Sequence, residues 1–219
     1  MIMNMTLSII GIIGGLICAI ADMLLDIKGK DNIKCGTNKM LDSNWQYMKE
    51  WRFSTSAIMA MIAVPMYSMG VISLGNQIGI HNELLGNGLK LSIFVGGMGG
   101  FFIHVFICTV PVIYKEIIKN NDFELADRVL NRAFKVVRVP FGVLYLVLMI
   151  FPTLIVCCSI VTGLLNVPTW FVLLNPVAFQ LLGWLLRIFK KEWFYEVPAI
   201  CAASLGLAMF GVIGVVNLV

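Results

Sequence analysis

Apolar residues occur along the chain in six runs, separated from one another by short polar segments. Each run is close to the roughly 20 residues that an α-helix needs to cross the hydrocarbon core of a bilayer. The predicted spans cover about 6–25, 53–74, 89–114, 139–161, 169–189 and 194–218. The pattern therefore predicts an all-α integral membrane bundle of six transmembrane helices, which forms a single domain over 1–219.

Two of the polar segments carry helical patterns of their own. Before the second span, the segment LDSNWQYMKEW places Trp45, Met48 and Trp51 at helical spacing, which is typical of a short helix in the headgroup region. After the third span, the segment FELADRVLNRAFKVVRV has one apolar and one basic side, and Asp122 precedes it as a possible helix cap. We expect both segments to form short amphipathic cytoplasmic helices.

Basic residues are confined almost entirely to one side of the predicted spans. The first, third and fifth loops hold six, six and three of the 16 Lys and Arg residues, and Lys90 at the start of the third span is the exception. Cytoplasmic loops carry such an excess of positive charge. The distribution predicts that both termini lie outside and that the odd-numbered loops face the cytoplasm, as in a multi-pass protein of the inner (cytoplasmic) membrane.

Composition supports the membrane assignment and excludes several kinds of site. The chain is 59% hydrophobic and 13% charged, whereas a soluble domain has about 25% charged residues. Its six cysteines show no C-x-x-C spacing and its two histidines form no cluster, and the sequence has no Walker, G-x-S-x-G or H-E-x-x-H motif. We expect no metal, no cofactor and no nucleic-acid partner, and a lipid bilayer around the chain.

Small residues form stripes on the predicted spans, and two of these stripes lead to an ionisable residue. In the third span, residues four apart are Gly96, Gly100, His104 and Cys108, while in the first span a comparable face ends at Asp22. Glycine lets a neighbouring helix approach closely, so the ionisable residue is expected to face that helix and not lipid. The stripes fit packing within the chain and assembly of a homo-oligomer equally well.

The candidate site lies in the cytoplasmic half of the bundle. We expect Asp22 and His104 to form a proton-active or ligand-binding pair, in a cavity that opens inward and is lined by spans one, two, three and five. Arg52 is expected to bind an anion or to hold Asp22 ionised. Alternatively, Asp22 pairs with Arg52 across a helical hairpin, and His104 bonds a backbone carbonyl or a hydroxyl. The candidate ligand-binding residues are Asp22, Asp26, Arg52, Tyr67, His104, Asn175 and Gln180.

Two further patterns each allow two interpretations. His104 and Cys108 are four residues apart, as an activated thiol nucleophile would require, but cysteine is also a common apolar filler of helices. Asn175 and Pro176 in the fifth span could mark a break that faces a cavity, or a plain proline kink in which Asn175 bonds locally.

The segments GLICAIADMLLD and WRFSTS resemble small multi-pass bacterial membrane proteins of unassigned function. The ADMLLD part is also similar to the aspartate-bearing helices of lysoplasmalogenase-type membrane hydrolases. This second similarity covers one helix end, and the later spans lack the further intramembrane aspartate that it leads one to expect. This second similarity implies that Asp22 corresponds to the aspartate on the helices of those hydrolases.

The leading hypothesis is a protein that binds or transports a small, partly apolar molecule through the cytoplasm-facing cavity. A second hypothesis is a membrane-embedded enzyme that acts on a lipid, with Asp22 and His104 as acid and base. A third is an immunity or assembly partner without a small-molecule site, whose polar residues only join helices.

Overall fold

The computed structural model describes residues 1–189 and 196–219. The described residues are almost entirely helical, and five helices are long and apolar enough to cross a membrane: α1 (Ile2–Asp26), α2 (Glu50–Gly79), α3 (Glu83–Ile118), the continuous stretch Phe123–Val161 and α7 (Val197–Val216). These helices make the chain a multi-pass membrane protein and place it in a lipid bilayer. The first two residues of the predicted sixth span, 194–195, lie outside the described residues.

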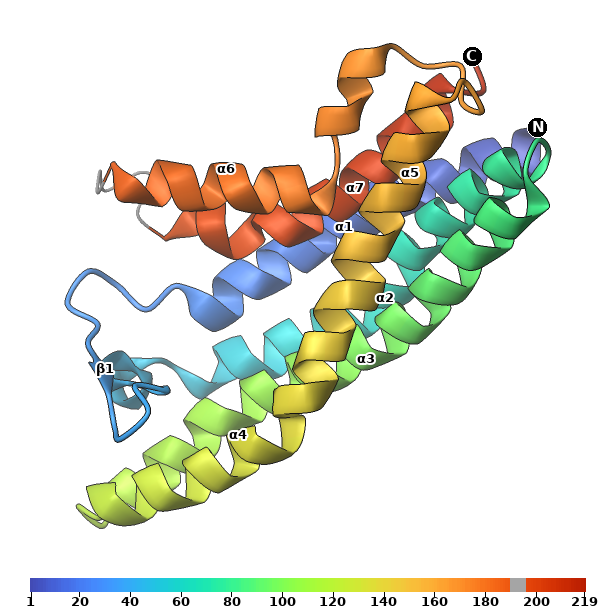
Figure 1. The fold of residues 1–219 in the computed structure, drawn as a ribbon. Coiled ribbons are helices and arrows are strands. Elements are labelled where there is room, and N and C mark those ends of the chain that lie inside the picture. The colour runs from blue at the N-terminus through green and yellow to red at the C-terminus, as the bar shows by residue number, and fades with distance from the viewer. Residues whose placement is uncertain (190–195) are drawn as a thin grey trace.

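The stretch Phe123–Val161 is one long bent helix made of three parts. These are α4 (Phe123–Tyr145), the π-helical turn η2 (Leu146–Ile150) and α5 (Phe151–Val161). Pro152 has no backbone N–H to donate into the preceding turn, which favours a wider turn at this place. The Ser92 hydroxyl of α3 donates to the Val147 carbonyl in the bend. Because the helix is bent, α4 packs beside α3, whereas α5 runs in a different direction, toward the termini (Figure 1).

The fifth predicted span differs from a full-length helix. The 3₁₀ segment η3 (Thr169–Leu173) comes first, and α6 (Pro176–Ile188) follows with 13 residues, which is about 20 Å at the rise of an α-helix. Asn175 caps α6, since its side-chain oxygen accepts from the Ala178 N–H at 2.9 Å. Each of the two interpretations of Asn175 and Pro176 holds in part. The helix breaks there, and α6 begins at Pro176, as proline at the first helical position favours. The break does not face the cavity, and Asn175 bonds locally.

Helix α1 lies between α2 and α7, and small residues set the closeness of both contacts (Figure 1). Gly11 faces the backbone of Gly70 in α2, and Gly15 faces Ala208 in α7, with no room for a side chain at either glycine. The stripe predicted on the first span therefore packs within the chain. A homo-oligomer stays a prediction.

The two ends of the bundle differ in what they carry (Figure 1). Both termini and the turn between α2 and α3 lie at one end, which we call the termini end. The loop between α1 and α2 and the turn between α3 and α4 lie at the other, which we call the loop end. With 36 residues, α3 is about 54 Å long, longer than the roughly 30 Å hydrocarbon core. An untilted α3 is therefore longer than the hydrocarbon core, and its last turns at the loop end carry Lys115 and Glu116.

The loop between α1 and α2 is folded against the protein. It contains the two-stranded hairpin β1 (Lys34–Cys35) and β2 (Leu41–Asp42), then the short 3₁₀ helix η1 (Ser43–Tyr47). Trp45 and Met48 are buried, and Trp45 meets Tyr114 of α3 edge to face, with ring centroids 5.6 Å apart. A short helix forms here as predicted, but its apolar side chains pack against α3 instead of facing lipid. Its place in the headgroup region stays a prediction. The second predicted amphipathic helix is the first half of α4, and its apolar face (Ala126, Leu130) is buried.

Candidate functional site

Asp22 of α1 and His104 of α3 come together near the loop end of the bundle. The Nδ1 atom of His104 lies 3.5 Å from Oδ1 of Asp22. Ser56 of α2 links the two helices, because its hydroxyl donates to the Ala21 carbonyl at 2.8 Å and also lies 2.8 Å from Nε2 of His104. One hydroxyl of α2 thus fixes the orientation of the imidazole against the C-terminal part of α1.

The Ser56 contacts assign the hydrogen on His104. A hydroxyl has a single proton to donate, and Ser56 donates it to the Ala21 carbonyl. Its oxygen therefore accepts the Nε2–H of His104, which leaves Nδ1 directed at the Asp22 carboxyl group. One further proton, held by Nδ1 or by the carboxyl group, can occupy the space between them. The arrangement is suited to accepting and releasing a proton.

Ser204 of α7 completes the environment of Asp22. Its hydroxyl donates to Oδ2 of Asp22 at 2.5 Å, the short distance typical of a hydrogen bond to a carboxylate. Sequence reasoning did not identify this residue. The available signal was that Ser204 is the only hydroxyl residue in the apolar helix Val197–Val216.

A cavity of about 470 Å³ extends beside the Asp22–His104 pair. Its walls come from α1, α2, α3, the bend of α4 and η2, α6 and α7. Asp22, His104 and Ser204 lie on one side, while Leu144 and Leu148 contribute apolar surface. Spans one, two, three and five contribute as predicted, and the fourth and sixth also take part. Small-molecule sites have volumes in this range and combine apolar walls with a few polar groups.

Tyr67 is a buried polar side chain in the part of the cavity wall formed by α2. It is 2% exposed, and a side chain built on Gly100 would lie 3.2 Å from its hydroxyl oxygen, so the hydroxyl points toward that glycine. Among the described residues, none forms a hydrogen bond with the Tyr67 hydroxyl. Every sealed side-chain oxygen or nitrogen among the described residues has a hydrogen-bond partner. The Tyr67 hydroxyl, which has none, therefore reaches the open space of the cavity and is available to a molecule there.

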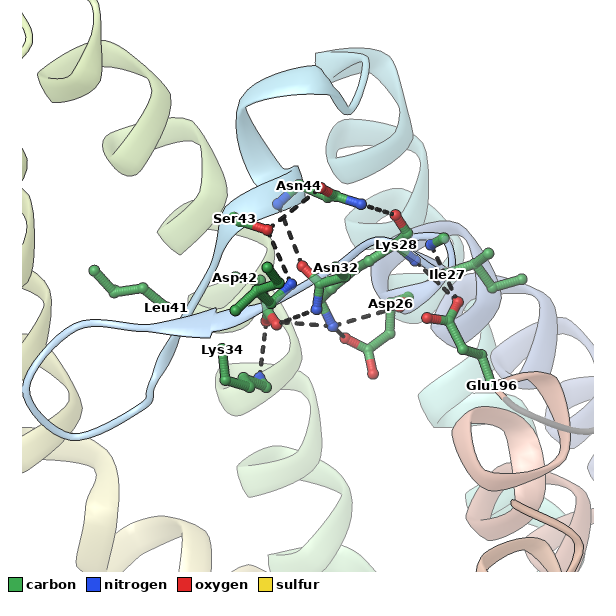
Figure 2. Close-up of polar contacts among 12 residues, drawn as sticks. Asp26, Ile27, Lys28, Asn32, Lys34, Leu41, Asp42, Ser43, Asn44 and Glu196 are labelled. Atoms are coloured by element: carbon green, nitrogen blue, oxygen red, sulfur yellow. Dashed lines mark hydrogen bonds and ion pairs between the residues drawn. The ribbon is translucent and has the colours of Figure 1, made fainter. Parts of the chain in front are cut away.

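Charged side chains from the loop end form the mouth of the cavity (Figure 2). Asp42 is 1% exposed and accepts from Asn32 at 2.6 Å and from Lys34 at 2.9 Å, with the Lys28 ammonium 3.5 Å away. The Glu196 carboxylate accepts from the backbone N–H of Lys28 at 3.2 Å. Among the described residues, three acidic ones (Asp26, Asp42, Glu196) and three basic ones (Lys28, Lys34, Arg187) line the mouth, so the formal charges of these six side chains cancel.

The cavity also reaches the lipid-facing surface. Phe141 of α4 and Trp184 of α6 both line it, yet they are 40% and 51% exposed. Residues that border a cavity and also face outward mark the edge of an opening. The cavity therefore opens sideways between α4 and α6 as well as toward the loop end.

Arg52 does not take part in the cavity. Its guanidinium donates to the carbonyls of Leu24 at 2.9 Å and of Ile27 at 2.7 Å, at the end of α1. These carbonyls have no partner within the helix, and a cation is favoured near them. The alternative in which Arg52 pairs with Asp22 is wrong, because the guanidinium is used to cap α1.

The other predicted residues divide between the cavity and the framework. Asp26 lies at the mouth, and Gln180 lines the wall while donating to the Ala199 carbonyl at 3.2 Å. Asn175 caps α6 and donates to the Val172 carbonyl at 2.7 Å, away from the cavity lining. Cys108 is buried in the cluster around Trp45 and Tyr114, so it is placed as an apolar filler and not as a nucleophile. In 1–189 and 196–219, no three His, Cys, Asp or Glu residues are placed to hold a metal ion.

Comparison with known proteins gives one match. The model of a family of unknown function, DUF6796, matches residues 1–219, and the chain belongs to this family. No curated protein matches the chain, and no solved structure matches it. The family membership agrees with the resemblance to membrane proteins of unassigned function.

Proposed function

We propose that this member of the DUF6796 family binds a small, partly apolar molecule in the intramembrane cavity and exchanges a proton with it through Asp22 and His104. The observation that carries the proposal is the Asp22–His104 pair on the wall of a cavity of about 470 Å³. Burying an ionisable pair at this depth costs free energy, so its presence makes a functional role the default hypothesis. The unpartnered hydroxyl of Tyr67 offers a further contact to the bound molecule.

The proposed topology has six crossings with both termini outside, in the inner membrane. Segment 169–188, with η3 and α6, serves as the broken crossing that completes the six. Two observations support this: both termini lie at the same end in Figure 1, and the segments rich in Lys and Arg lie at the other. The predicted Lys190 and Lys191 of the fifth loop lie outside the described residues. In this orientation the cavity opens toward the cytoplasm.

The chemistry of the cavity favours an amphiphile without net charge. The described acidic and basic residues balance at the mouth, so neither an anion nor a cation gains from their formal charge there. The opening between Phe141 and Trp184 faces lipid, which admits a molecule dissolved in the membrane. The polar end of such a molecule would lie near Asp22 and the mouth, and its apolar part along Leu144 and Leu148.

In the termini half of the bundle, packed side chains close the cavity toward the termini end. Beyond Tyr67, the core is filled by packed apolar side chains that include Leu74, Ile78, Phe210 and Ile213. The cavity ends below this layer, so a molecule bound in it would have no path to the termini end in this conformation. Transport would require the helices to reopen toward the termini end.

Extraction of the bound molecule tests the proposal directly. The full chain is purified from native membranes in mild detergent, and small molecules are extracted and identified by mass spectrometry. We expect a specific amphiphile with the natural protein and its loss from Asp22→Asn and His104→Gln. Ser8→Ala, on α1 but outside the cavity, is the matched control and should retain it. Equal retention by all variants, or ordinary bulk phospholipid only, contradicts the proposal.

A second candidate function is an enzyme that acts on a lipid by acid–base catalysis. The fixed orientation of His104, with Nε2 held by Ser56 and Nδ1 toward Asp22, is the observation that favours it. An enzyme would convert the extracted amphiphile in detergent without a gradient. A transporter would move it only across sealed proteoliposomes, in a manner that depends on a proton gradient and on His104.

A further inference from the structure

A second hollow lies on the other side of the α3–α4 wall. It has a volume of about 550 Å³ and is bordered by the tip of the α1–α2 loop, by α3 and by the middle of α4. Ile103, Ile107 and Phe141 border both this hollow and the cavity described above. We call it the α3–α4 groove. It lies at the loop end of the bundle.

The groove is apolar along its length and cationic at its rim. Phe106 and Phe134 meet edge to face within it, with ring centroids 5.6 Å apart. Lys135 and Arg138 are exposed at its edge, and none of the described residues that line it is acidic. Within the described ranges 1–189 and 196–219, neither cation forms an ion pair. This differs from the mouth of the cavity, where the described acids and bases balance.

Hydrogen bonds hold the loop tip against α4 and so give the groove a fixed end. The Asp127 carboxylate accepts from the Thr37 N–H at 3.1 Å and from the Thr37 hydroxyl. The Asn38 amide donates to Asn131 at 2.9 Å. Because Asp127 is engaged by Thr37, its charge is directed at the loop and not at Arg138. The groove is therefore a built feature of the fold and not a gap between mobile segments.

We propose that the α3–α4 groove binds an anionic phospholipid. The phosphate contacts Lys135 and Arg138, and one acyl chain lies along Phe106 and Phe134. A basic pocket beside transmembrane helices, at the level of the anionic leaflet, has the chemistry that such headgroups require. Arginine can hold a phosphate through two parallel hydrogen bonds. The inference rests on the proposed orientation of the loop end, but not on the ligand of the Asp22–His104 cavity.

Native mass spectrometry of the full chain in detergent tests the proposal. Delipidated protein is mixed with dioleoylphosphatidylglycerol or dioleoylphosphatidylcholine, which differ in headgroup charge but have the same acyl chains. We expect tighter binding of the first lipid, and a loss of about tenfold in its affinity when Lys135→Gln and Arg138→Gln are combined. The matched control combines Arg128→Gln and Arg132→Gln, which removes the same charge from the same helix outside the groove.

A second variant tests the apolar part of the groove without changing charge. Met40 borders the groove from the exposed loop tip, and Met40→Trp should fill part of it and weaken binding of both lipids. Glycerol phosphate, which has the headgroup chemistry but no acyl chain, should not compete. Equal losses in the two double variants would show diffuse attraction to surface charge and overturn the proposal, as would equal affinity for the two lipids.

Discussion

Two polar clusters occur along α1, α2 and α7 of this bundle, the inner one with a further member on α3, and they differ in what surrounds them. The outer cluster, near the termini end, consists of Ser8, Ser73, Gln77 and Asn217. The inner cluster, toward the loop end, consists of Asp22, Ser56, Tyr67, His104 and Ser204. Ser8, Ser73 and Gln77 of the outer cluster and Ser56, Tyr67 and Ser204 of the inner cluster are buried, while Asn217, Asp22 and His104 are partly buried. Only the inner cluster borders the cavity.

The outer cluster satisfies its own hydrogen bonds. The hydroxyls of Ser8 and Ser73 are 2.9 Å apart, Ser73 donates to the Asn4 carbonyl, and Gln77 donates to Ser73 at 3.2 Å and accepts from Asn217 at 2.8 Å. Gly214 packs against Ser8 with no room for a side chain. Such a closed network joins helices in the absence of water.

The inner cluster leaves polar groups facing open space. The Tyr67 hydroxyl lacks a protein partner among the described residues, and the Asp22–His104 pair borders the cavity. A polar residue in a membrane helix therefore indicates a site only when it keeps a hydrogen-bonding or ionisable group that faces open space. Gln77 is 2% exposed and fully engaged in hydrogen bonds, whereas Asp22 borders the cavity.

The largest expected effect on stability comes from the close contact between helices α1 and α2. Gly11→Val places a side chain against the Gly70 backbone, where neither helix can yield cheaply, and should cost about 3 kcal/mol of stability. Gly142→Val is the control, because nothing lies within 4 Å of a side chain at that position. Thermal unfolding in detergent measures both, and equal melting temperatures would contradict the packing described for α1 and α2.

Removing a member of the outer cluster should lower stability without affecting ligand binding. Gln77→Leu leaves the Asn217 amide without its acceptor, which should cost about 2 kcal/mol. The molecule that copurifies with the protein should still be retained. If Gln77→Leu releases it while Asp22→Asn does not, the roles assigned to the two clusters are reversed.

A double-mutant cycle should show that Ser204 is energetically coupled to the inner cluster and independent of the outer one. Ser204 and Asp22 share a hydrogen bond, so Ser204→Ala and Asp22→Asn should be non-additive by about 1 kcal/mol. Ser204→Ala and Gln77→Leu share no partner and should be additive. The free energies of unfolding of the single and double variants provide the measurement, and additivity in the first pair would remove Ser204 from the inner cluster.

The smallest effect concerns Cys35, which reports the side of the membrane on which the loop end lies. Burial, followed by the negative charges of Asp42 and Asp127, raises the pKa of the Cys35 thiol. Because only the thiolate reacts, labelling by a membrane-impermeant maleimide should be slow at neutral pH and should quicken as the pH rises. In a Cys158→Ser background, which removes an exposed cysteine elsewhere in the chain, labelling should occur in inverted vesicles and not in intact cells, with Cys35→Ser added as the unlabelled control. Labelling in intact cells would reverse the proposed topology.

The fold could be predicted where hydropathy alone decides the structure. The runs that became α1, α2, α3 and α7 are long and apolar, and bilayer thickness leaves a helix as their stable form. Segment 169–189 was expected as one helix, but Asn175 caps a new helix and Pro176 begins it. The segment around Trp45 was expected as a short helix in the headgroup region, and only the structure shows that Tyr114 of α3 is its packing partner.

The candidate site could be predicted in its residue types but not in its connections. Asp22 and His104 stand out because ionisable residues are costly in apolar helices. Arg52 stood out equally, and only the positions of Leu24 and Ile27 show that it caps α1. Ser204 was missed because a serine is inexpensive in a membrane helix, and nothing nearby in sequence indicates that it meets Asp22.

The sequence by itself determined that the chain is a multi-pass membrane protein with its basic segments at one end. Hydropathy and charge are properties of single residues and short windows, so the pattern of one chain suffices for them. Only the tertiary structure decided that Asp22, His104 and Ser204 meet beside a cavity, while Ser8 and Gln77 close on each other. Such pairings depend on how each helix is rotated about its axis, and that rotation is set by contacts such as Gly11 with Gly70, between residues far apart in the chain.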